Sequence, residues 1–441
     1  MINKTILKLS EIEDNNWGAE YYHPDKLKAI KILSKSNDRI SSFFSPIKKT
    51  YHVKEGNKNI INLEGVSQGF IQNSTSEKSK SNKKRVKEGD IIISKLRPYL
   101  KEISLVSKKF DDFYVSTELI ILREKVKKDG FRFILLPFLF TKEVQKILFW
   151  SQQGTNHPRF NEKVLLDINF PKFKESFIKN IENNILESYR CYNRGIELYL
   201  EAEKKLLSYF NLDSIEKETK KFSIRSFSET LLNNRFDADF YQEKYDKMMD
   251  LMMKKSKTDK LGELVKIKKG IEVGADEYLD EGIPFIRVSN VSKFEVTPND
   301  QKFISKETYE RYKDNFKPKK NEVLLTKDGS LGISLLINQD KESLISGGIL
   351  RLNVDSPLIT KEYLSLILNS KLVHFQIEKY SGGAIIVHWR PELIKETIIP
   401  IINEKKMQEL TELIKESYSL IEKSKFIFKR AIEEIESEII K

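Results

Sequence analysis

The sequence predicts an α+β protein with two mixed, β-rich modules and two long helices that pair as an antiparallel coiled coil, related by a pseudo-twofold internal repeat. Three observations lead to this fold class. The chain of 441 residues is longer than one ordinary domain. Its segments recur in the same order, and each copy ends in a stretch with apolar residues at steps of three and four.

The repeat is clearest in two stretches of eighteen residues that start 229 positions apart. Residues 154–171 read GTNHPRFNEKVLLDINFP, and residues 383–400 read GAIIVHWRPELIKETIIP. Each runs from Gly through a basic and aromatic patch into an apolar segment that Pro closes. A sequence motif that recurs in this way indicates that a whole structural unit is duplicated.

Further segments of the two copies match in the same order. The matched pairs are 15–22 with 233–241, 38–40 with 259–261, 47–49 with 267–269, 60–67 with 285–292, 86–95 with 318–327, and 115–117 with 345–347. Short apolar runs punctuated by Gly, Asn and Pro predict strands in 38–125 and 259–355, and helices are expected at 131–150 and 360–380. Each copy is therefore expected to contain a mixed, β-rich module.

Sustained helical periodicity follows each closing proline. The apolar stripes comprise Ile178, Ile181, Ile185, Tyr189 and Tyr192 in the first copy, and Met407, Leu410, Ile414, Tyr418 and Ile421 in the second. A helix over 172–208 would be about 55 Å long and would need a partner stripe, which the second copy supplies. We therefore expect two spacer helices that pack antiparallel.

These patterns give the expected domain boundaries. The first module occupies 1–171, the central spacer helix 172–210, a linker 211–232, the second module 233–400 and the C-terminal spacer helix 401–441.

Composition bounds the classes of partner and compartment. A formal charge of +12 and a pI near 9.2 favour a polyanionic partner, although the chain is rich in Lys throughout. Cys191 is the only cysteine, which excludes an intramolecular disulfide and a cysteine-based zinc cluster. No apolar run has the length of a signal peptide or a membrane span, so a cytoplasmic protein that does not bind membranes is expected.

The sequence contains no convincing catalytic motif. It lacks a phosphate-binding P-loop, the motif of amino-group methyltransferases and a dinucleotide-binding glycine loop. The five histidines show no metal-ligand spacing. We therefore expect no catalytic residue, no bound metal and no cofactor on this chain.

Basic and amide side chains near the ends of the predicted strands are the candidate DNA-binding residues. Arg and Lys neutralise phosphate or bind guanine, and Asn reads adenine. The candidates are Lys83, Lys84, Arg85, Lys95, Arg97, Lys101, Asn156, His157 and Arg159 in the first copy, and Lys268, Lys269, Arg287, Asn290, Lys327, His388 and Arg390 in the second. A solvated basic surface is the alternative interpretation of any single lysine.

The ordered duplication, together with the texts GDIIISKLRPYL, GTNHPRFNEKVLLDINFP, NEVLLTKDGSLG and GGAIIVHWRPELIKETIIP, resembles the specificity subunit of type I restriction-modification enzymes over residues 15–441. The resemblance implies that each module is a target-recognition domain that reads one half of a bipartite double-stranded DNA sequence. It further implies that the helices set the gap and dock two methyltransferase subunits, and that restriction and translocase subunits join through the complex.

The same resemblance implies that chemistry belongs to the partners. Adenine-N6 methylation and ATP-dependent cleavage would need S-adenosylmethionine, ATP and Mg on those subunits, with the target base flipped out of the duplex. Two alternatives stay open on the residues alone: a DNA- or RNA-binding coiled-coil adaptor of another defence assembly, and a nuclease or methyltransferase with degenerate motifs.

Overall fold

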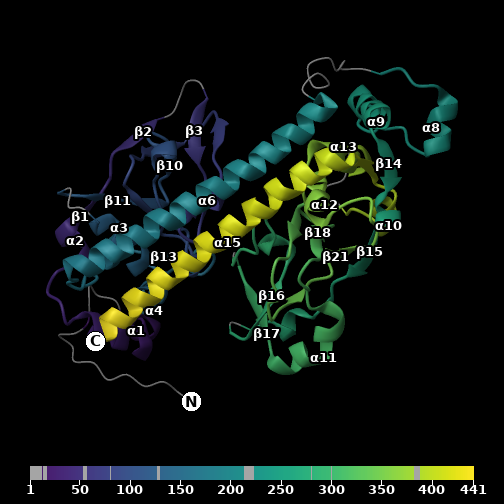
Figure 1. Cartoon of the computed structure of the whole chain (residues 1–441). Helices are drawn as coiled ribbons and strands as arrows, with labels where there is room; N and C mark the ends of the chain where they lie inside the picture. Colours follow the sequence, from purple (N-terminus) through teal and green to yellow (C-terminus); the bar gives the residue numbers. More distant parts are fainter. Residues whose placement is uncertain are drawn as a thin grey trace. The chain divides into compact units, whose positions relative to one another are not determined.

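The computed structural model describes residues 12, 17–52, 57–79, 81–126, 130–212, 223–279, 281–298, 300–381 and 388–441. Two compact units divide the chain. Unit 1 comprises Met1–Tyr192 and Lys423–Lys441, and unit 2 comprises Asn193–Glu422 (Figure 1). The expected boundaries separated the helices from the modules, whereas each compact unit contains one β-rich module together with part of both long helices.

Among the described residues, the module of unit 1 holds two larger sheets and two smaller sheets of two strands each. Its strands are β1 (Phe44–Pro46), β2 (Thr50–His52), β3 (Lys58–Ile61), β4 (Val66–Ser67), β5 (Phe70–Ile71), β6 (Thr75–Glu77), β7 (Asn82–Arg85), β8 (Ile91–Ser94), β9 (Ile103–Leu105), β10 (Tyr114–Ser116), β11 (Leu119–Glu124), β12 (Gln152–Gln153) and β13 (Arg159–Phe160). The first sheet is antiparallel in the order β1-β11-β8-β9, and the second has the order β2-β7-β10-β3-β6 with β3 and β10 parallel.

Short helices complete this module. They are α1 (Pro24–Leu33), α2 (Ile40–Phe43), α3 (Phe131–Phe138), α4 (Lys142–Trp150) and α5 (Glu162–Asp167), with 3-10 turns η2 (Ala19–Tyr22), η3 (Leu63–Gly65), η4 (Pro98–Leu100) and η5 (Lys108–Phe110). The helix predicted over 131–150 is confirmed as the pair α3 and α4. Asn161 caps α5 because its side chain accepts a hydrogen bond from the Lys163 amide at 2.9 Å.

The module of unit 2 repeats part of this plan. Its strands are β14 (Lys257–Lys260), β15 (Val265–Lys269), β16 (Ile283–Ile286), β17 (Lys302–Ile304), β18 (Val323–Thr326), β19 (Ser334–Leu336), β20 (Leu344–Ile345), β21 (Ile349–Val354) and β22 (Ile398–Ile401). Its helices are α8 (Phe227–Asn233), α9 (Glu243–Lys255), α10 (Leu261–Leu264), α11 (Lys306–Phe316), α12 (Lys361–Leu368), α13 (Lys371–Ser381) and α14 (Pro391–Lys395), with turns η6 (Ala275–Glu277) and η7 (Val288–Asn290).

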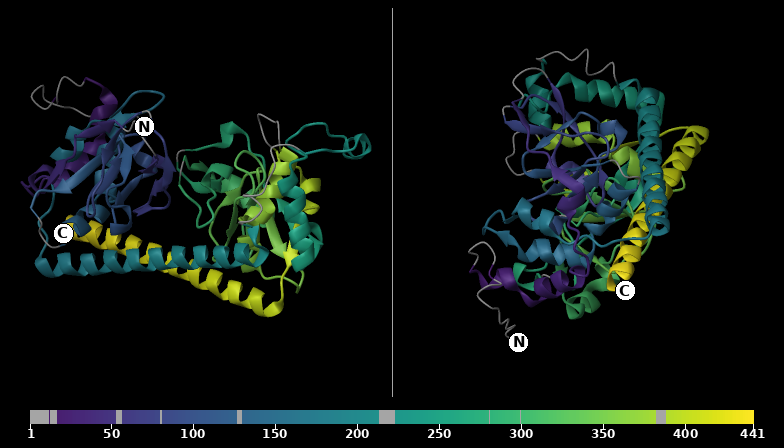
Figure 2. Two further views of the ribbon diagram at one scale, coloured as in Figure 1. Left: turned by 90° about the horizontal axis from the view of Figure 1, so that it is seen from above. Right: turned by 90° about the vertical axis from the view of Figure 1, so that its left-hand side faces the viewer.

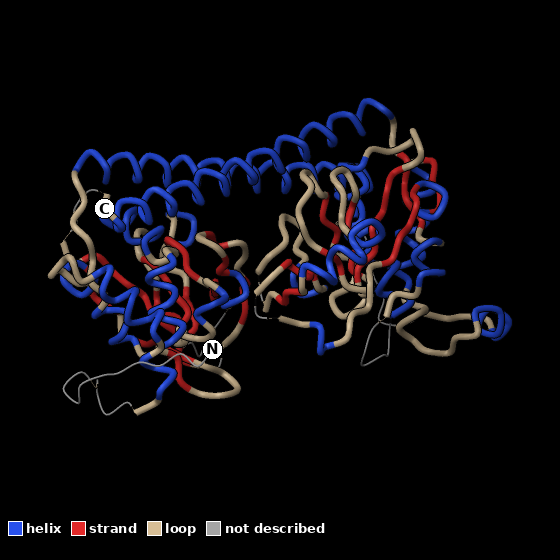
Figure 3. Tube along the Cα trace, turned by 90° about the horizontal axis from the view of Figure 1, so that it is seen from below, coloured by secondary structure: helices blue, strands red, loops and turns tan. Residues whose placement is uncertain are grey.

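Sheet topology confirms the predicted internal repeat. The sheet β15-β21-β18-β19 is antiparallel and matches β1-β11-β8-β9 strand for strand, and β16 pairs parallel with β20 as β3 does with β10. Figure 3 shows the strands gathered in each unit with helices packed against them. One predicted match is wrong by one residue: β1 places Pro46 opposite Leu122, and Ile267 stands at the equivalent place opposite Leu352.

The central strand of each first sheet lies in an apolar core. All four residues of β8 and all four of β18 are buried. The core of unit 1 includes Ile61, Ile92, Val115 and Ile121, and that of unit 2 continues from the module onto both long helices. Uninterrupted apolar strands of this kind are typical of positions covered on both faces.

Each module differs beside its parallel strand pair. In unit 1 the basic strand β7 pairs with β10, whereas in unit 2 the helix α11 occupies the corresponding part of the chain and β20 pairs with β16. Ser305 caps α11 by accepting a hydrogen bond from the Thr308 amide at 3.1 Å. The modules therefore share a framework and differ in peripheral elements, which include β2 and β7 in unit 1 and α11 and the pair β14-β22 in unit 2.

The two long helices are α6 (Glu175–Phe210) and α15 (Glu404–Ile440), close to the predicted ranges 172–210 and 401–441. Within unit 1 they run antiparallel, since Ser188 Oγ donates to the Ser424 carbonyl at 2.9 Å and Asn180 donates to Glu434 at 2.8 Å (Figure 2). Within unit 2 they are also antiparallel, because Ser417 Oγ donates to the Gly195 carbonyl at 2.7 Å. The predicted antiparallel pairing is confirmed inside each unit.

Small residues make the closest contact between the helices. A Cβ at Gly195 would lie 2.7 Å from Ile421 Cγ1 and 2.9 Å from the Ser417 carbonyl oxygen. Ser188 and Ser424 are buried and hydrogen-bonded to each other. The contact Ser188–Ser424 recurs as Ser417–Gly195, with the two helices exchanging roles, because each position lies 229 residues from its counterpart.

The predicted apolar stripe packs on the modules as well as between the helices. Nine of its ten residues are buried: Ile178, Ile181, Ile185, Tyr192, Met407, Leu410, Ile414, Tyr418 and Ile421. Tyr189 is half-buried and its hydroxyl accepts a hydrogen bond from the Leu105 amide of β9 at 3.1 Å. Tyr192 stacks on Phe70 of β5 at 4.2 Å, so the stripe also anchors each module to its helix.

Two predicted features fall partly outside the described residues. The expected linker 211–232 includes 213–222, and the stretch that opens the second repeat motif includes 382–387. The matched segment 15–22 likewise includes Asn15 and Asn16, which are not described.

Candidate nucleic-acid interface

The first group of candidate residues lies where β8 ends in unit 1. The Lys95 amide donates to the Glu118 carbonyl at 3.1 Å, and the Phe160 amide donates to the Lys95 carbonyl at 3.2 Å. The Arg97 amide donates to the Pro158 carbonyl at 2.9 Å. These backbone bonds join the strand end to the segment before α5, which carries Arg159.

The second group stands at the equivalent place after β18 in unit 2. The Lys327 amide donates to the Gly348 carbonyl at 2.9 Å, and the Trp389 amide donates to the Lys327 carbonyl at 2.9 Å. Asp328 and His388 form an antiparallel bridge, as Leu96 and Arg159 do in unit 1. His388 therefore occupies the position of Arg159, and the sequence match between the segments before α5 and α14 is confirmed in three dimensions.

A carboxylate pairs with the cation in each group. In unit 1, Arg159 Nε donates to Glu118 Oε2 at 2.9 Å and Arg159 Nη2 to Glu118 Oε1 at 3.4 Å. In unit 2, His388 Nδ1 lies 2.8 Å from Asp328 Oδ1, and Lys327 Nζ lies 2.6 Å from Asp328 Oδ2. We name Lys95, Glu118 and Arg159 the first strand-end cluster, and Lys327, Asp328 and His388 the second strand-end cluster.

Both carboxylates are held in the ionised form. The hydrogen bond from Arg159 lowers the pKa of Glu118 below its usual value, and burial opposes this shift. Burial acts to raise the pKa of Asp328, but the hydrogen bonds from His388 and Lys327 outweigh it, so that pKa is also lowered. At neutral pH each cluster thus presents a carboxylate that accepts hydrogen bonds only, beside cations that donate them.

The two acids come from different places in the repeat. Glu118 corresponds to Gly348, because the amides of Lys95 and Lys327 bind these two carbonyls. A Cβ at Gly348 would lie 2.7 Å from Val288 Cγ2 and 3.3 Å from Asp328 Oδ2, so Val288 and Asp328 together occupy the space that a side chain at position 348 would enter. Two unrelated positions therefore supply a carboxylate to the same region of each module.

Strand β7 of unit 1 carries the candidates Lys83, Lys84 and Arg85, whose side chains have different surroundings. Lys83 is half-buried, and Arg85 Nη2 lies 2.9 Å from Asp112 Oδ2. Lys84 is buried and its Nζ donates to the Leu119 carbonyl at 2.9 Å, while burial lowers its pKa. The ammonium group of Lys84 is thus turned into the module, and its predicted contact with DNA stays a prediction.

The turn after β8 separates its basic residues. Arg97 and Lys101 both adopt the left-handed conformation, with φ of 46° and 53°, on either side of η4. Burial lowers the pKa of Lys101, and the charge of Glu436 on α15 opposes that shift. Lys101 therefore lies toward the helix, which argues against its predicted role in DNA contact. Arg97 is half-buried, and Asn156 and His157 are exposed.

The remaining candidates of unit 2 fall into two classes. Lys268, Lys269 and Arg390 are exposed, and Lys269 Nζ lies 3.4 Å from Glu272 Oε1. Arg287 Nη2 donates to Asp300 Oδ2 at 2.6 Å, which commits much of its guanidinium to an internal contact.

Asn290 is fully buried in unit 2. Its side chain accepts from the Arg287 amide at 2.9 Å and donates to the Thr297 carbonyl at 3.0 Å. The side chain of Asn290 thus stabilises the turn η7, and its predicted contact with DNA stays a prediction.

Sequence reasoning missed the two acids, Glu118 and Asp328. Basic and amide residues were favoured as candidates, and a carboxylate beside a lysine is commonly a solvated surface pair. The available signal was the position of both residues next to the ends of buried strands, but their convergence on one place depends on which strands are neighbours.

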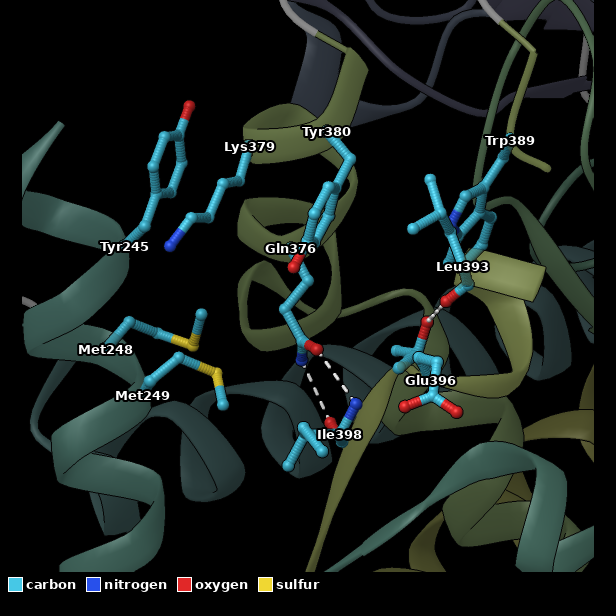
Figure 4. Close-up of a pocket in the computed structure, with 11 residues that line it drawn as sticks. Tyr245, Met248, Met249, Gln376, Lys379, Tyr380, Trp389, Leu393, Glu396 and Ile398 are labelled. Atoms are coloured by element: carbon cyan, nitrogen blue, oxygen red, sulfur yellow. Dashed lines mark hydrogen bonds between the residues drawn. The ribbon is translucent and has the colours of Figure 1, made fainter. Parts of the chain in front are cut away.

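A pocket of about 190 Å³ lies behind Trp389 in unit 2, between α9, α13 and α14 (Figure 4). Several of its polar groups bind within the module: Gln376 donates to the Ile398 carbonyl at 2.9 Å and Thr397 donates to the Leu393 carbonyl at 3.1 Å. Lys379 Nζ lies 3.3 Å from Asp246. Trp389 is buried, lines this pocket and follows His388 in the chain, so the pocket lies near the second strand-end cluster.

The described part of the chain offers neither a metal centre nor a membrane span. Among those residues, no set of His, Cys, Asp and Glu side chains is arranged to hold a metal ion. No helix among them combines the length and the apolar character needed to cross a membrane.

Comparison with protein families assigns the second half of the chain. Residues 253–425 match the family model described as the type I restriction modification DNA specificity domain. These residues are similar to that family. The match covers most of the module of unit 2 and the first half of α15, and the suspected resemblance to type I specificity subunits is thereby confirmed.

Similar solved structures span the specificity domain and the preceding half. The HsdS subunit from Thermoanaerobacter tengcongensis is 15% identical, with 91% of this chain and 95% of that chain covered and a TM-score of 0.31. The type I S subunit from M. genitalium is 14% identical, with 91% and 94% covered and a TM-score of 0.35. A chain from a type I R-M system studied for complex assembly is 16% identical, with 91% and 93% covered and a TM-score of 0.30. A search of curated protein sequences finds no match.

Proposed function

We propose that this protein is a non-catalytic DNA-recognition and scaffold subunit of a type I restriction-modification complex. In this proposal each module reads one half of a bipartite double-stranded target. The observation that carries the proposal is that the module without a family match shares a four-stranded antiparallel sheet and a parallel strand pair with the module that matches the specificity-domain model. A framework that is used twice is suited to two separate half-sites.

The long helices support a role as a spacer. Each is a single helix of more than thirty residues, and each packs against module residues in the unit where it begins. A helix fixes the separation of its ends at 1.5 Å per residue, so it transmits a defined distance. In the proposal the gap between half-sites depends on these helices, and two methyltransferase subunits dock on the scaffold.

The partners supply the chemistry in this proposal. The methyltransferase subunits bind S-adenosylmethionine and methylate adenine N6, while restriction and translocase subunits use ATP and Mg. Adenine would be flipped from the duplex into the pocket of the partner. We propose that the complex works in the cytoplasm, where its DNA substrate lies.

Modified-base sequencing tests the proposal most directly. Cells that express this chain with its methyltransferase partner should carry methylated adenines in a single bipartite motif, which gives both half-sites and their gap together. Cells that express the methyltransferase alone serve as the control and should lack that motif.

Three results would contradict the proposal. Methylation in a continuous motif would contradict the recognition of a bipartite target. Methylation or cleavage of DNA by the purified chain alone would make it an enzyme, and binding to single-stranded RNA without a preferred duplex sequence would favour an adaptor role.

A further inference from the structure

The strand-end clusters combine features suited to reading a base edge. Each holds a carboxylate next to a donor: Glu118 beside Arg159, and Asp328 beside His388. The side chains remain accessible, with exposed fractions of 31% and 45% in the first pair and 26% and 63% in the second. A ligand can therefore reach both members of each pair.

The ion pairs are not needed to hold the local backbone together. The bonds from Phe160 to Lys95 and from Arg97 to Pro158 already join the strand end to the segment before α5 in unit 1. The bond from Trp389 to Lys327 does so for the segment before α14 in unit 2. An exposed ion pair contributes little to stability. A contribution to stability therefore does not explain why an acidic residue is present in both clusters, at positions that do not correspond in the repeat.

The groups offer hydrogen-bonding capacity beyond their mutual contact. A carboxylate has about four lone-pair sites. Arg159 donates from Nε and Nη2 to Glu118 and from Nη1 to the His157 carbonyl, which leaves further N–H groups on Nη1 and Nη2. In the major groove, only adenine N6 and cytosine N4 present an amino group, and a purine N7 or O6 acceptor lies beside it in the same base pair or base. An acceptor next to a donor matches that arrangement.

We propose that Glu118 and Asp328 each accept a hydrogen bond from the exocyclic amino group of an adenine or a cytosine, one in each half-site, while Arg159 and the doubly protonated form of His388 donate to the neighbouring purine acceptor. The inference rests on the proposed function, because it assigns base-reading residues to the two modules. It adds that the specificity-determining contacts include acidic residues and that equivalent clusters serve separate half-sites.

Glu118→Gln and Asp328→Asn in the full chain test the inference. Each variant keeps the size of the side chain but adds an amide donor, so it should tolerate a base that presents an acceptor at one position. Modified-base sequencing should show that Glu118→Gln relaxes one position in one half-site and Asp328→Asn relaxes one position in the other. The expected loss of preference is about tenfold at each position, and the relaxed position identifies adenine or cytosine.

Asp167→Asn is the matched control, because Asp167 forms an equally exposed pair with Arg39 at 3.0 Å on another part of unit 1. It should leave the motif unchanged. Relaxation of several positions in both half-sites, or complete loss of methylation, would overturn the inference, since both results indicate a displaced module and not one lost contact.

The proposed function and the inference fail in different ways. If the unaltered complex methylates no bipartite motif, the proposed function fails. If it does so and both variants keep every base preference, only the assignment of Glu118 and Asp328 is wrong.

Discussion

Arg351 and Glu322 form a buried bidentate ion pair in unit 2, with Arg351 Nε and Nη2 donating to the two carboxylate oxygens at 2.8 and 2.7 Å. Arg123 makes the same contact with Asp90 in unit 1, at 2.7 Å for both bonds. Both acids also accept a backbone amide three residues earlier, from Lys319 and Lys87. The acids stand at equivalent places before β8 and β18, whereas the arginines stand two places apart on the equivalent strands β11 and β21. Both modules thus join their two central strands by the same kind of ion pair.

Arg351→Ala should destabilise unit 2 by about 3–5 kcal/mol, because it leaves the carboxylate of Glu322 buried without its partner. The side chain of Arg351 is 1% exposed and that of Arg123 is 36% exposed, so Arg123→Ala should cost clearly less. Hydrogen exchange of β18, β21, β8 and β11 measures each effect locally. Glu438→Gln, in an exposed pair on α15, is the control. Equal losses in the two modules would contradict the role of burial.

Gly195→Val should weaken the pairing of α6 with α15 in unit 2, because the added carbons would meet Ile421 and the Ser417 carbonyl. Overpacking of this kind costs about 1–3 kcal/mol. Thermal unfolding and hydrogen exchange along both helices would measure the change. Arg190→Ala, at a 75% exposed side chain of the same helix, should have little effect. Unaltered protection in Gly195→Val would show that the helices can separate at this point without cost.

Four residues inserted next to Arg194 should change the gap between half-sites, because a helical insertion lengthens the spacer by about 6 Å and rotates the remainder of the helix. The half-site sequences should stay the same. Modified-base sequencing of the full complex measures both quantities. A four-residue insertion between the exposed residues Lys341 and Glu342 provides the control and should leave the gap unchanged. An unchanged gap in the helix variant would exclude α6 from setting the distance.

Glu102 should make the stability of unit 1 depend on pH. Burial raises its pKa to about 7, while the hydrogen bond from Ser94 and the charge of Arg97 oppose the shift and Glu64 adds to it. The folded state therefore binds the proton more tightly than the unfolded state does. Stability contributed by the protonated form is complete below the ordinary pKa of about 4.5 and decreases as pH rises toward 7.

Glu102→Gln tests this linkage, because it removes the titration and keeps the shape. The variant should gain stability relative to the unaltered protein at pH 8, and the difference should shrink at pH 5. Urea unfolding at the two pH values is the measurement. A difference that is the same at both values would mean that Glu102 does not titrate in this range.

The sequence predictions that the structure confirmed depended on patterns that can be recognised in the sequence alone. The repeat, the strands β8 and β18, the helix pairs α3–α4 and α12–α13 and both long helices were all identifiable, because apolar periodicity indicates burial directly. The slip at β1 has a local cause: three residues between polar neighbours carry too little pattern to fix a register, which pairing with β11 decides.

The candidate site was less predictable. The spacing of polar residues in the sequence does not show whether their side chains are exposed. Lys84 and Asn290 were therefore selected although the fold buries both. The acids Glu118 and Asp328 were missed because their partners Arg159 and His388 lie 41 and 60 residues away in the chain, respectively. Only neighbouring strands bring these groups together.

The sequence by itself determined that this protein is a duplicated α+β chain with two long amphipathic helices, since each of these features follows from local composition and order. The tertiary structure decided which face of each helix binds a module and which serine or glycine meets the opposite helix. It also decided which charges are paired, because contacts between residues far apart in the chain depend on how strands and helices pack. The physical reason is that burial of apolar side chains is encoded along the chain, whereas the pairing of polar groups requires geometry.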